Sequence, residues 1–219
     1  MATKRLLVVE GEEDKKLFTS LSRAFGITNI DVVCSTPGKG NAIRTLCQSL
    51  AMQTRASDAR IGAVVDADFP ADGGGFAASL AELNSKLSQV PEGPLRRLPG
   101  GGFDVGCTKG PKLKSGVWVM PDNASDGYVE HFFVRNIAKS EIARFAYTSA
   151  QCATALDPAQ SGLTFPVRSM HVTKAEVGMW LALQDPPRMS LAKASSCSLL
   201  DLRAPLYSQL EHWMKWLFL

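Results

Sequence analysis

The sequence predicts an α/β protein with a parallel sheet covered by helices on both faces. Three observations predict it. First, the 219 residues are 45% hydrophobic and 21% charged, as in folded globular chains. Second, a short apolar strand pattern followed by an amphipathic helix pattern occurs three times in succession. Third, the strand patterns are continuous apolar runs, which indicates burial on both faces of the sheet.

The first two strand–helix units occupy the N-terminal fifty residues. A strand is expected over 4–9, where an aliphatic run ends at Glu10-Gly11, and a helix over 12–25. A second strand over 29–34 precedes a break containing proline and glycine. A second helix is then expected over 42–52, because its apolar residues recur on one helical face.

The third unit and a fourth strand follow. The patterns predict a strand over 60–65, a helix over 76–90, a strand over 113–120 and a helix over 127–146. Residues 91–112 are rich in glycine and proline and show no apolar periodicity that we recognise, so we expect a long loop there. The prediction is therefore a parallel sheet of about four strands flanked by helices on both faces.

Two regions are expected along the chain. Residues 1–148 form the α/β domain, and residues 149–219 form a helical C-terminal extension packed on it. Within the domain, 91–116 is a basic loop with five cationic residues against Glu92 and Asp104, an excess equal to the net charge of +3 of the whole chain. The cationic residues are Arg96, Arg97, Lys109, Lys112 and Lys114.

Several classes of protein are excluded. The five cysteines contain no C-x-x-C pair and the three histidines are far apart, which disfavours a zinc module or a disulfide framework. The N-terminal apolar run is too short for a signal peptide or a membrane span, so we expect a cytoplasmic protein with no membrane partner. Neither lysine-containing glycine loop matches the phosphate-loop pattern of ATPases.

Acidic residues follow the predicted strands. Glu10 closes the first strand, Asp66 and Asp68 close the third, and Asp122 closes the fourth; Asp14 and Glu130 lie in the helices that follow. If these three strands are neighbours, as in a flavodoxin-like order, the carboxylates converge at one edge of the sheet. Carboxylates without histidine or cysteine suit Mg²⁺ or Mn²⁺. The alternative is a set of solvated turn and N-cap residues.

Two of these segments resemble the signatures of the TOPRIM domain. They are Val9-Glu10-Gly11-Glu12-Glu13-Asp14 after the first strand and Val65-Asp66-Ala67-Asp68 after the third. With the stretch 117–123 and the tryptophan-containing tail, the chain is similar to a small stand-alone TOPRIM-like family of mostly uncharacterised bacterial proteins, related to the OLD nucleases.

The resemblance implies a metal-dependent nuclease. Glu10 would be the general acid/base or a metal-associated glutamate, and Asp66 and Asp68 would be metal ligands. Asp14, Asp122 and Glu130 would complete an OLD-like metal set. We therefore expect an enzyme that uses Mg²⁺ or Mn²⁺ to hydrolyse phosphodiester bonds of DNA or RNA.

Basic residues are the candidates for contact with the nucleic acid. Lys39, between Gly38 and Gly40, could meet a phosphate at a helix N-terminus, or lie in an ordinary loop. The five cationic residues of 91–116 could follow a phosphodiester backbone, or form a solvated insertion. Lys174 could act as a catalytic cation for the transition state, or be a surface lysine.

A second class of function stays open. The chain could be a non-catalytic metal- or nucleic-acid-binding module that is a subunit or regulator of a larger complex, for example with a separately encoded ATPase in phage defence. Self-association is a further option, and the hydrophobic end Trp216-Leu217-Phe218-Leu219 fits a partner-dependent protein. A nucleotide-binding or phosphotransfer enzyme on the same scaffold is a weaker alternative.

Overall fold

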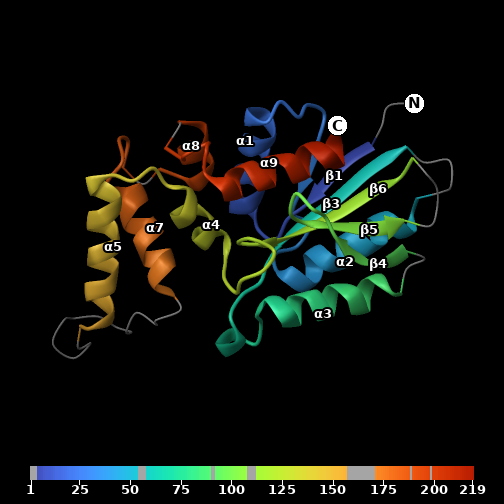
Figure 1. Ribbon diagram of the computed structural model, residues 1–219, viewed down its shortest axis with the longest axis horizontal. Helices are drawn as coiled ribbons and strands as arrows, with labels where there is room; N and C mark the ends of the chain where they lie inside the picture. The colour runs from blue at the N-terminus through green and yellow to red at the C-terminus, as the bar shows by residue number, and fades with distance from the viewer. Residues whose placement is uncertain are drawn as a thin grey trace.

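A six-stranded, mostly parallel sheet forms the centre of the computed structural model (Figure 1). The structure describes residues 4–53, 58–89, 92–107, 112–156, 171–187, 189–197 and 199–219. The strand order is β2-β1-β3-β6-β5-β4. The strands are β1 (Lys4–Val8), β2 (Asp31–Val33), β3 (Ala59–Asp66), β4 (Glu92–Arg97), β5 (Phe103–Cys107) and β6 (Lys114–Met120). The α/β class predicted from the sequence is confirmed.

The four predicted parallel strands are neighbours in the expected order. β1 pairs in parallel with β2 and β3, and β3 pairs in parallel with β6 from Arg60↔Lys114 to Asp66↔Met120. Since β1, β3 and β6 adjoin one another, their carboxyl ends meet at one edge of the sheet. This edge carries the candidate site.

The predicted loop over 91–112 is wrong for its described part, which forms a β-hairpin. β4 and β5 are antiparallel, and β5 continues antiparallel onto β6. The reason is a short two-residue alternation: Phe103 and Val105 are buried against the sheet core, while Asp104 between them pairs across the ladder with Arg96. The turn that connects the strands contains two glycines with positive φ.

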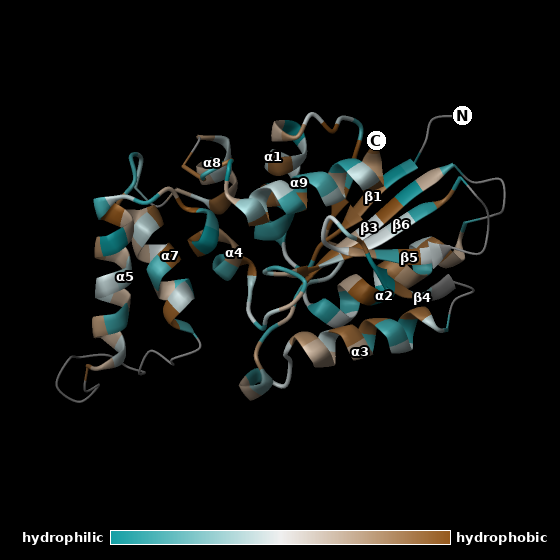
Figure 2. Ribbon diagram, viewed as in Figure 1, coloured by the Kyte–Doolittle hydropathy of each residue, from teal (hydrophilic) through white to brown (hydrophobic). Residues whose placement is uncertain are grey.

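Helices cover both faces of the sheet (Figure 1). α2 (Lys39–Ala51) and α3 (Phe76–Leu87) pack on one face, in a cluster with alternate residues of β1 and β3. α1 (Glu12–Ala24) and α9 (Pro205–Phe218) cover the opposite face. The strands at the centre are coloured as hydrophobic, as burial on both sides requires (Figure 2).

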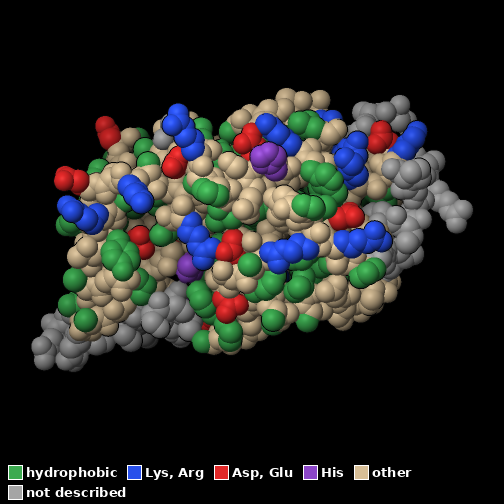
Figure 3. All heavy atoms as spheres, in the orientation of Figure 1, with side chains coloured by type: hydrophobic (Ala, Val, Ile, Leu, Met, Phe, Trp, Pro, Cys, Tyr) green, Lys and Arg blue, Asp and Glu red, His purple; other side chains and the backbone are tan. Residues whose placement is uncertain are grey.

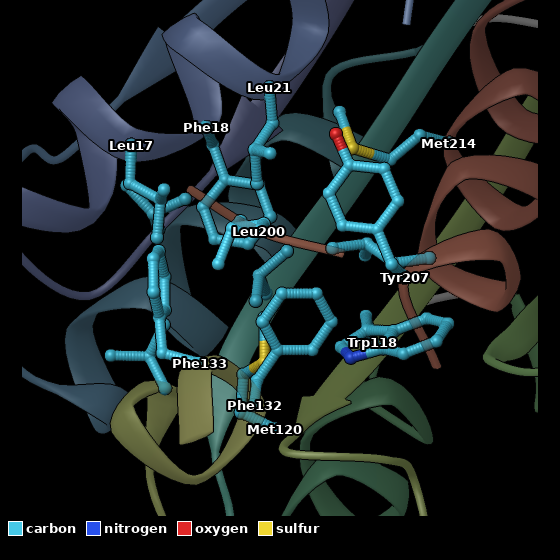
Figure 4. Packing of buried hydrophobic residues seen from close by; sticks show 14 of the residues in the cluster. Leu17, Phe18, Leu21, Trp118, Met120, Phe132, Phe133, Leu200, Tyr207 and Met214 are labelled. Carbon is cyan, nitrogen blue, oxygen red and sulfur yellow. The ribbon is translucent and has the colours of Figure 1, made fainter. Parts of the chain in front are cut away.

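The core on the α1 side is rich in aromatic rings (Figure 4). α9 contributes Tyr207 and Met214, which lie beside Trp118 of β6. The end of the same helix is also internal, because Leu217 and Phe218 are fully buried. These two side chains of the hydrophobic C-terminus therefore complete this chain's own core.

The single helix predicted over 127–146 is two helices. α4 (Val129–Asn136) ends before Ile137, and α5 (Glu141–Thr154) begins after Ser140, whose Oγ accepts a hydrogen bond from the backbone N–H of Ala143 at 3.2 Å. The domain boundary predicted at 148 falls within α5. This helix packs against α7 (Val172–Ala182) beyond the end of the sheet (Figure 1).

The remaining described helix, α8 (Leu191–Ser196), packs against α1. α7, α8 and α9 thus make the C-terminal region helical in its described part, and α9 contacts both β3 and β6. No helix in the described ranges combines the length and the apolar character that a membrane crossing requires.

Candidate functional site

Glu10 and Asp66 lie together at the carboxyl edge of the sheet. Glu10 follows β1 and Asp66 is the last residue of β3, so the pairing of these strands brings the two residues side by side. The backbone N–H of Asp66 donates a hydrogen bond of 2.7 Å to Oε1 of Glu10. The convergence predicted from strand ends is present for this pair.

The Asp66 carboxylate is aimed at the start of α4. Its Oδ1 accepts a hydrogen bond of 3.0 Å from the backbone N–H of Val129. Burial raises the pKa of Asp66 well above its usual range, and the nearby carboxylates raise it further. Those carboxylates, in order of effect, belong to Glu10, Asp14, Glu130 and Asp68.

The pKa values of Glu10 and Asp14 are both raised. Burial raises the pKa of Glu10 to about 7, against the opposing effect of the hydrogen bond from Asp66. Burial likewise raises the pKa of Asp14 to about 6, and the charge of Glu130 adds to that rise. Five of the six predicted metal ligands therefore lie within electrostatic reach of one another. We call Glu10, Asp14, Asp66, Asp68 and Glu130 the acidic cluster.

Asp68 lies in an unusual turn and pairs with Lys39. Its φ is 61°, in the left-handed region, and its backbone exchanges two hydrogen bonds of 2.9 Å with Gly127. A Cβ at Gly74 would lie 2.5 Å from the Cβ of Asp68, so only glycine fits there. Nζ of Lys39 is 2.6 Å from Oδ2 of Asp68. Lys39, predicted to contact phosphate, instead pairs with a member of the acidic cluster.

Asp122 does not join the acidic cluster, so its predicted place among the metal ligands is wrong. Its carboxylate accepts hydrogen bonds from the backbone N–H groups of Ala124 and Ser125 and from the Ser125 hydroxyl, and it pairs with Arg135. These hydrogen bonds hold the pKa of Asp122 below its usual value despite its partial burial. Asp122 is therefore a turn residue, as the alternative interpretation of the strand-end acids proposed.

The predicted basic segment does not act as a unit. Arg97 donates to the backbone oxygen of Asn123 at 2.8 Å, beside the carboxyl end of β6, and Arg96 is exposed on the same strand. Lys114 begins β6, roughly 20 Å of strand from its carboxyl end. Its ammonium donates to the backbone oxygen of Trp216. Lys112 precedes Lys114 at that far edge, and Lys109 lies outside the described residues.

The described residues on the face of the molecule shown in Figure 3 form no continuous basic surface. Lysine and arginine side chains are spread over it and alternate with acidic ones, instead of forming a continuous basic track. Of the basic residues predicted within 91–116, only Arg96 and Arg97 are described at the end of β4, an edge strand that β6 and β5 separate from β3.

Lys174 of α7 reaches the acidic cluster through a group of rings. Its Nζ lies 3.9 Å from the centroid of the Tyr128 ring, and its charge lowers the pKa of Asp14. The Tyr128 hydroxyl donates to Asp72, and its ring lies edge-on to Phe69. The Tyr128 side chain is buried. Asp72 and Phe69 carry no spacing signal in the sequence, because only the turn after β3 brings them to Tyr128.

Ser79 is a second neighbour that the sequence does not mark. It is a fully buried polar residue of α3, and its hydroxyl donates to the backbone oxygen of Ala67 at 2.9 Å. The sequence feature that could have identified Ser79 is its place on the apolar face of a predicted helix.

A family model described as "Protein of unknown function (DUF3226)" matches residues 4–219. The chain belongs to this family. No curated protein and no solved structure matches it. The match to DUF3226 includes both the sheet and the helical C-terminal region, so all described elements belong to the region that the family model spans.

The acidic cluster of this DUF3226 chain fits a divalent cation by its chemistry. Its donors are carboxylate oxygens, and the pKa values of Glu10, Asp14 and Asp66 are all raised, in part by one another. Within the described ranges, no three histidine, cysteine, aspartate or glutamate side chains are gathered closely enough to hold a metal as they stand. Binding would therefore require these side chains to turn toward a common ion.

Proposed function

We propose that this DUF3226 protein is a Mg²⁺- or Mn²⁺-dependent nuclease of the TOPRIM/OLD-like type that hydrolyses phosphodiester bonds of DNA or RNA. The supporting observation is the pair Glu10 and Asp66, hydrogen-bonded at adjoining strand ends among further carboxylates. Carboxylates that raise one another's pKa are unfavourable near neutral pH, and a divalent cation relieves that repulsion.

Four carboxylates would hold the ion. They belong to Glu10, Asp14, Asp66 and Glu130, and none of them forms an ion pair within the described part of the chain. The bound ion would supply electrostatic stabilisation of the negative charge that develops on phosphoryl oxygens.

Glu10 is suited to proton transfer. Oε1 accepts the hydrogen bond from Asp66, which leaves Oε2 as the atom that takes a proton from the attacking water. In the metal-free protein burial raises the pKa of Glu10 to about 7, and a bound ion would lower it again, so that the carboxylate is ionised as a proton acceptor must be. The ring contact with Tyr128 holds the Lys174 ammonium near Asp14, where it would stabilise negative charge on the substrate.

Arg97 and Arg96 would meet the polymer outside the acidic cluster. They are the last two residues of β4. Their charge would neutralise a phosphate backbone bound at this end of the strand. We place the activity in the cytoplasm, a compartment in which the thiol of Cys34 stays reduced.

The second candidate is the non-catalytic module that acts with a separate ATPase. One observation, that no three potential ligands are gathered for a metal among the described residues, favours the form of this module that binds nucleic acid. Such a module would bind metal or nucleic acid without cleaving it.

Cleavage assays separate the two candidates. Supercoiled plasmid and single-stranded RNA are incubated with wild-type protein in Mn²⁺, in Mg²⁺ and in EDTA. We expect cleavage only with metal, and a loss of about 100-fold or more in Glu10→Gln and Asp66→Asn. Asp31→Asn is the matched control, because Asp31 is an exposed aspartate at the start of β2, where it pairs with Leu6 in the middle of β1. Binding of either polymer without cleavage in any metal would favour the non-catalytic module.

A further inference from the structure

The Lys39 ammonium is enclosed by three oxygen atoms. Nζ lies 2.6 Å from Oδ2 of Asp68 and donates to the hydroxyl of Ser79 at 2.9 Å and to the backbone oxygen of Ala67 at 3.2 Å. An ammonium has three donors, and each has a partner here. The Lys39 side chain is only 13% exposed, so this is an internal cation and not a surface lysine.

The main chain fixes this cation beside the acidic cluster. Lys39 is the first residue of α2, and Gly38 before it has a φ of 107°. The Gly38 N–H donates to the backbone oxygen of Glu10 at 2.9 Å. The loop that carries Lys39 is therefore tied directly to the residue that carries the central glutamate. The charge of Lys39 acts on Glu10 as well as on Asp68.

Asp68 is held as firmly as its partner. The paired hydrogen bonds with Gly127 fix its backbone, and Gly74 lies against its side chain. A divalent ion could ligate Oδ2 of Asp68 in this position only by displacing an ammonium that has three hydrogen-bond partners. The displaced ammonium, on a side chain that is 13% exposed, would lose its charged partner, which is unfavourable.

We propose that Lys39 is a built-in counter-cation of the acidic cluster, which occupies the position on Asp68 that a second divalent ion would otherwise take. The site then binds a single divalent ion, on the side of Glu10 and Asp66, and Asp68 pairs with lysine instead of metal. This inference rests on the proposed function and specifies its metal requirement. It also replaces the two roles predicted from the sequence, phosphate contact for Lys39 and metal ligation for Asp68.

Calorimetric titration with Mn²⁺ tests the proposal without an activity assay. We expect one ion per chain in wild type and in Asp68→Asn, with dissociation constants within about threefold of each other. Asp66→Asn should lose the ion. Lys39→Met frees Asp68 and should either add a second ion or tighten binding about tenfold. Lys86→Met, which removes an exposed lysine of α3, is the matched control and should match wild type.

Thermal unfolding in EDTA supplies a readout independent of metal. Lys39→Met should lower the melting temperature, because it leaves the Asp68 carboxylate without its ammonium. The double variant Lys39→Met/Asp68→Asn should recover most of that loss, because its two neutral side chains no longer need each other. Asp68→Asn alone can be titrated even if Lys39→Met does not fold.

The outcomes separate the inference from the proposed function. Loss of the ion in Asp68→Asn, or two ions in wild type, would overturn the inference and leave the nuclease proposal standing. Unchanged stoichiometry and affinity in a folded Lys39→Met would also overturn it. If wild type binds no Mn²⁺, the single-ion inference and the metal-dependent nuclease proposal are both contradicted. The unfolding data in EDTA would then show only whether the Lys39 ammonium stabilises the Asp68 carboxylate.

Discussion

Oε1 of Glu10 accepts a 2.7 Å hydrogen bond from the backbone N–H of Asp66, which joins the carboxyl ends of β1 and β3. The two carboxylates are thereby held close enough for each charge to oppose the other. The relationship is set by strand pairing, since these residues end adjacent parallel strands. The proposed chemistry depends on this pair.

The raised pKa of Glu10 makes stability depend on pH in a defined direction. Its pKa rises from 4.5 to about 7 on folding, so between these values the folded protein binds more protons than the unfolded chain. The free energy of unfolding should therefore be highest below the unfolded pKa and fall as pH increases toward 7. Denaturant unfolding in EDTA across pH 4.5–7 measures this, and Glu10→Gln should reduce the slope, to which the raised pKa values of Asp14 and Asp66 also contribute. A wild-type stability that rises through this window, with no effect of Glu10→Gln, would contradict it.

Asp66→Asn should separate stability from activity. The amide oxygen can still accept the hydrogen bond from Val129, while the substitution removes a buried charge that repels Glu10 and Asp14. We expect a metal-free melting temperature at pH 8 equal to or above that of wild type, and no cleavage. Differential scanning calorimetry checks the first part. A marked fall in the melting temperature would show that the carboxylate has a structural role that repulsion does not outweigh.

The C-terminal helix end should be required for stability. Phe218 is fully buried, whereas its neighbour Leu219 is 57% exposed. Phe218→Ala should lower the free energy of unfolding by about 3–5 kcal/mol. Leu219→Ala is the control and should change it by less than about 0.5 kcal/mol. Urea denaturation measures both, and equal effects of the two substitutions would refute the packing described for α9.

Lys174 should affect cleavage without affecting metal binding. Its ammonium lies over the Tyr128 ring and outside the four carboxylates proposed to hold the ion. Lys174→Met should reduce the cleavage rate about 10- to 100-fold, with Mn²⁺ affinity unchanged within about threefold. Lys193→Met, on α8, is the control. Full cleavage activity in a folded Lys174→Met would remove Lys174 from the site.

The sequence predicted the parts of this fold that depend on local pattern. The continuous apolar run before Glu10 and the one before Asp66 predicted two of the buried parallel strands, and their neighbouring positions brought these two acids together. The β4–β5 hairpin was missed because its alternating pattern is short and lies among glycine and proline. The break between α4 and α5 was missed because apolar residues continue through it; of these, Phe145 is 61% exposed on α5.

Part of the candidate site could be predicted because its residues lie at the ends of strands. Strand ends can be located from the chain, but ion pairs between distant elements cannot. The pairing of Lys39 with Asp68 joins residues of two different strand–helix units, and only the folded chain shows it. Asp122 carried a local signal that was available, since Ser125 follows at the spacing of a side-chain-capped turn. The TOPRIM resemblance stays a prediction.

The most direct test of the central claim is Mn²⁺ binding and polymer cleavage measured on the same preparations of wild type and Asp66→Asn. The account predicts that wild type binds Mn²⁺ and cleaves plasmid or RNA, and that folded Asp66→Asn loses both. Cleavage that persists in Asp66→Asn, or a wild-type protein that binds no Mn²⁺, would contradict it.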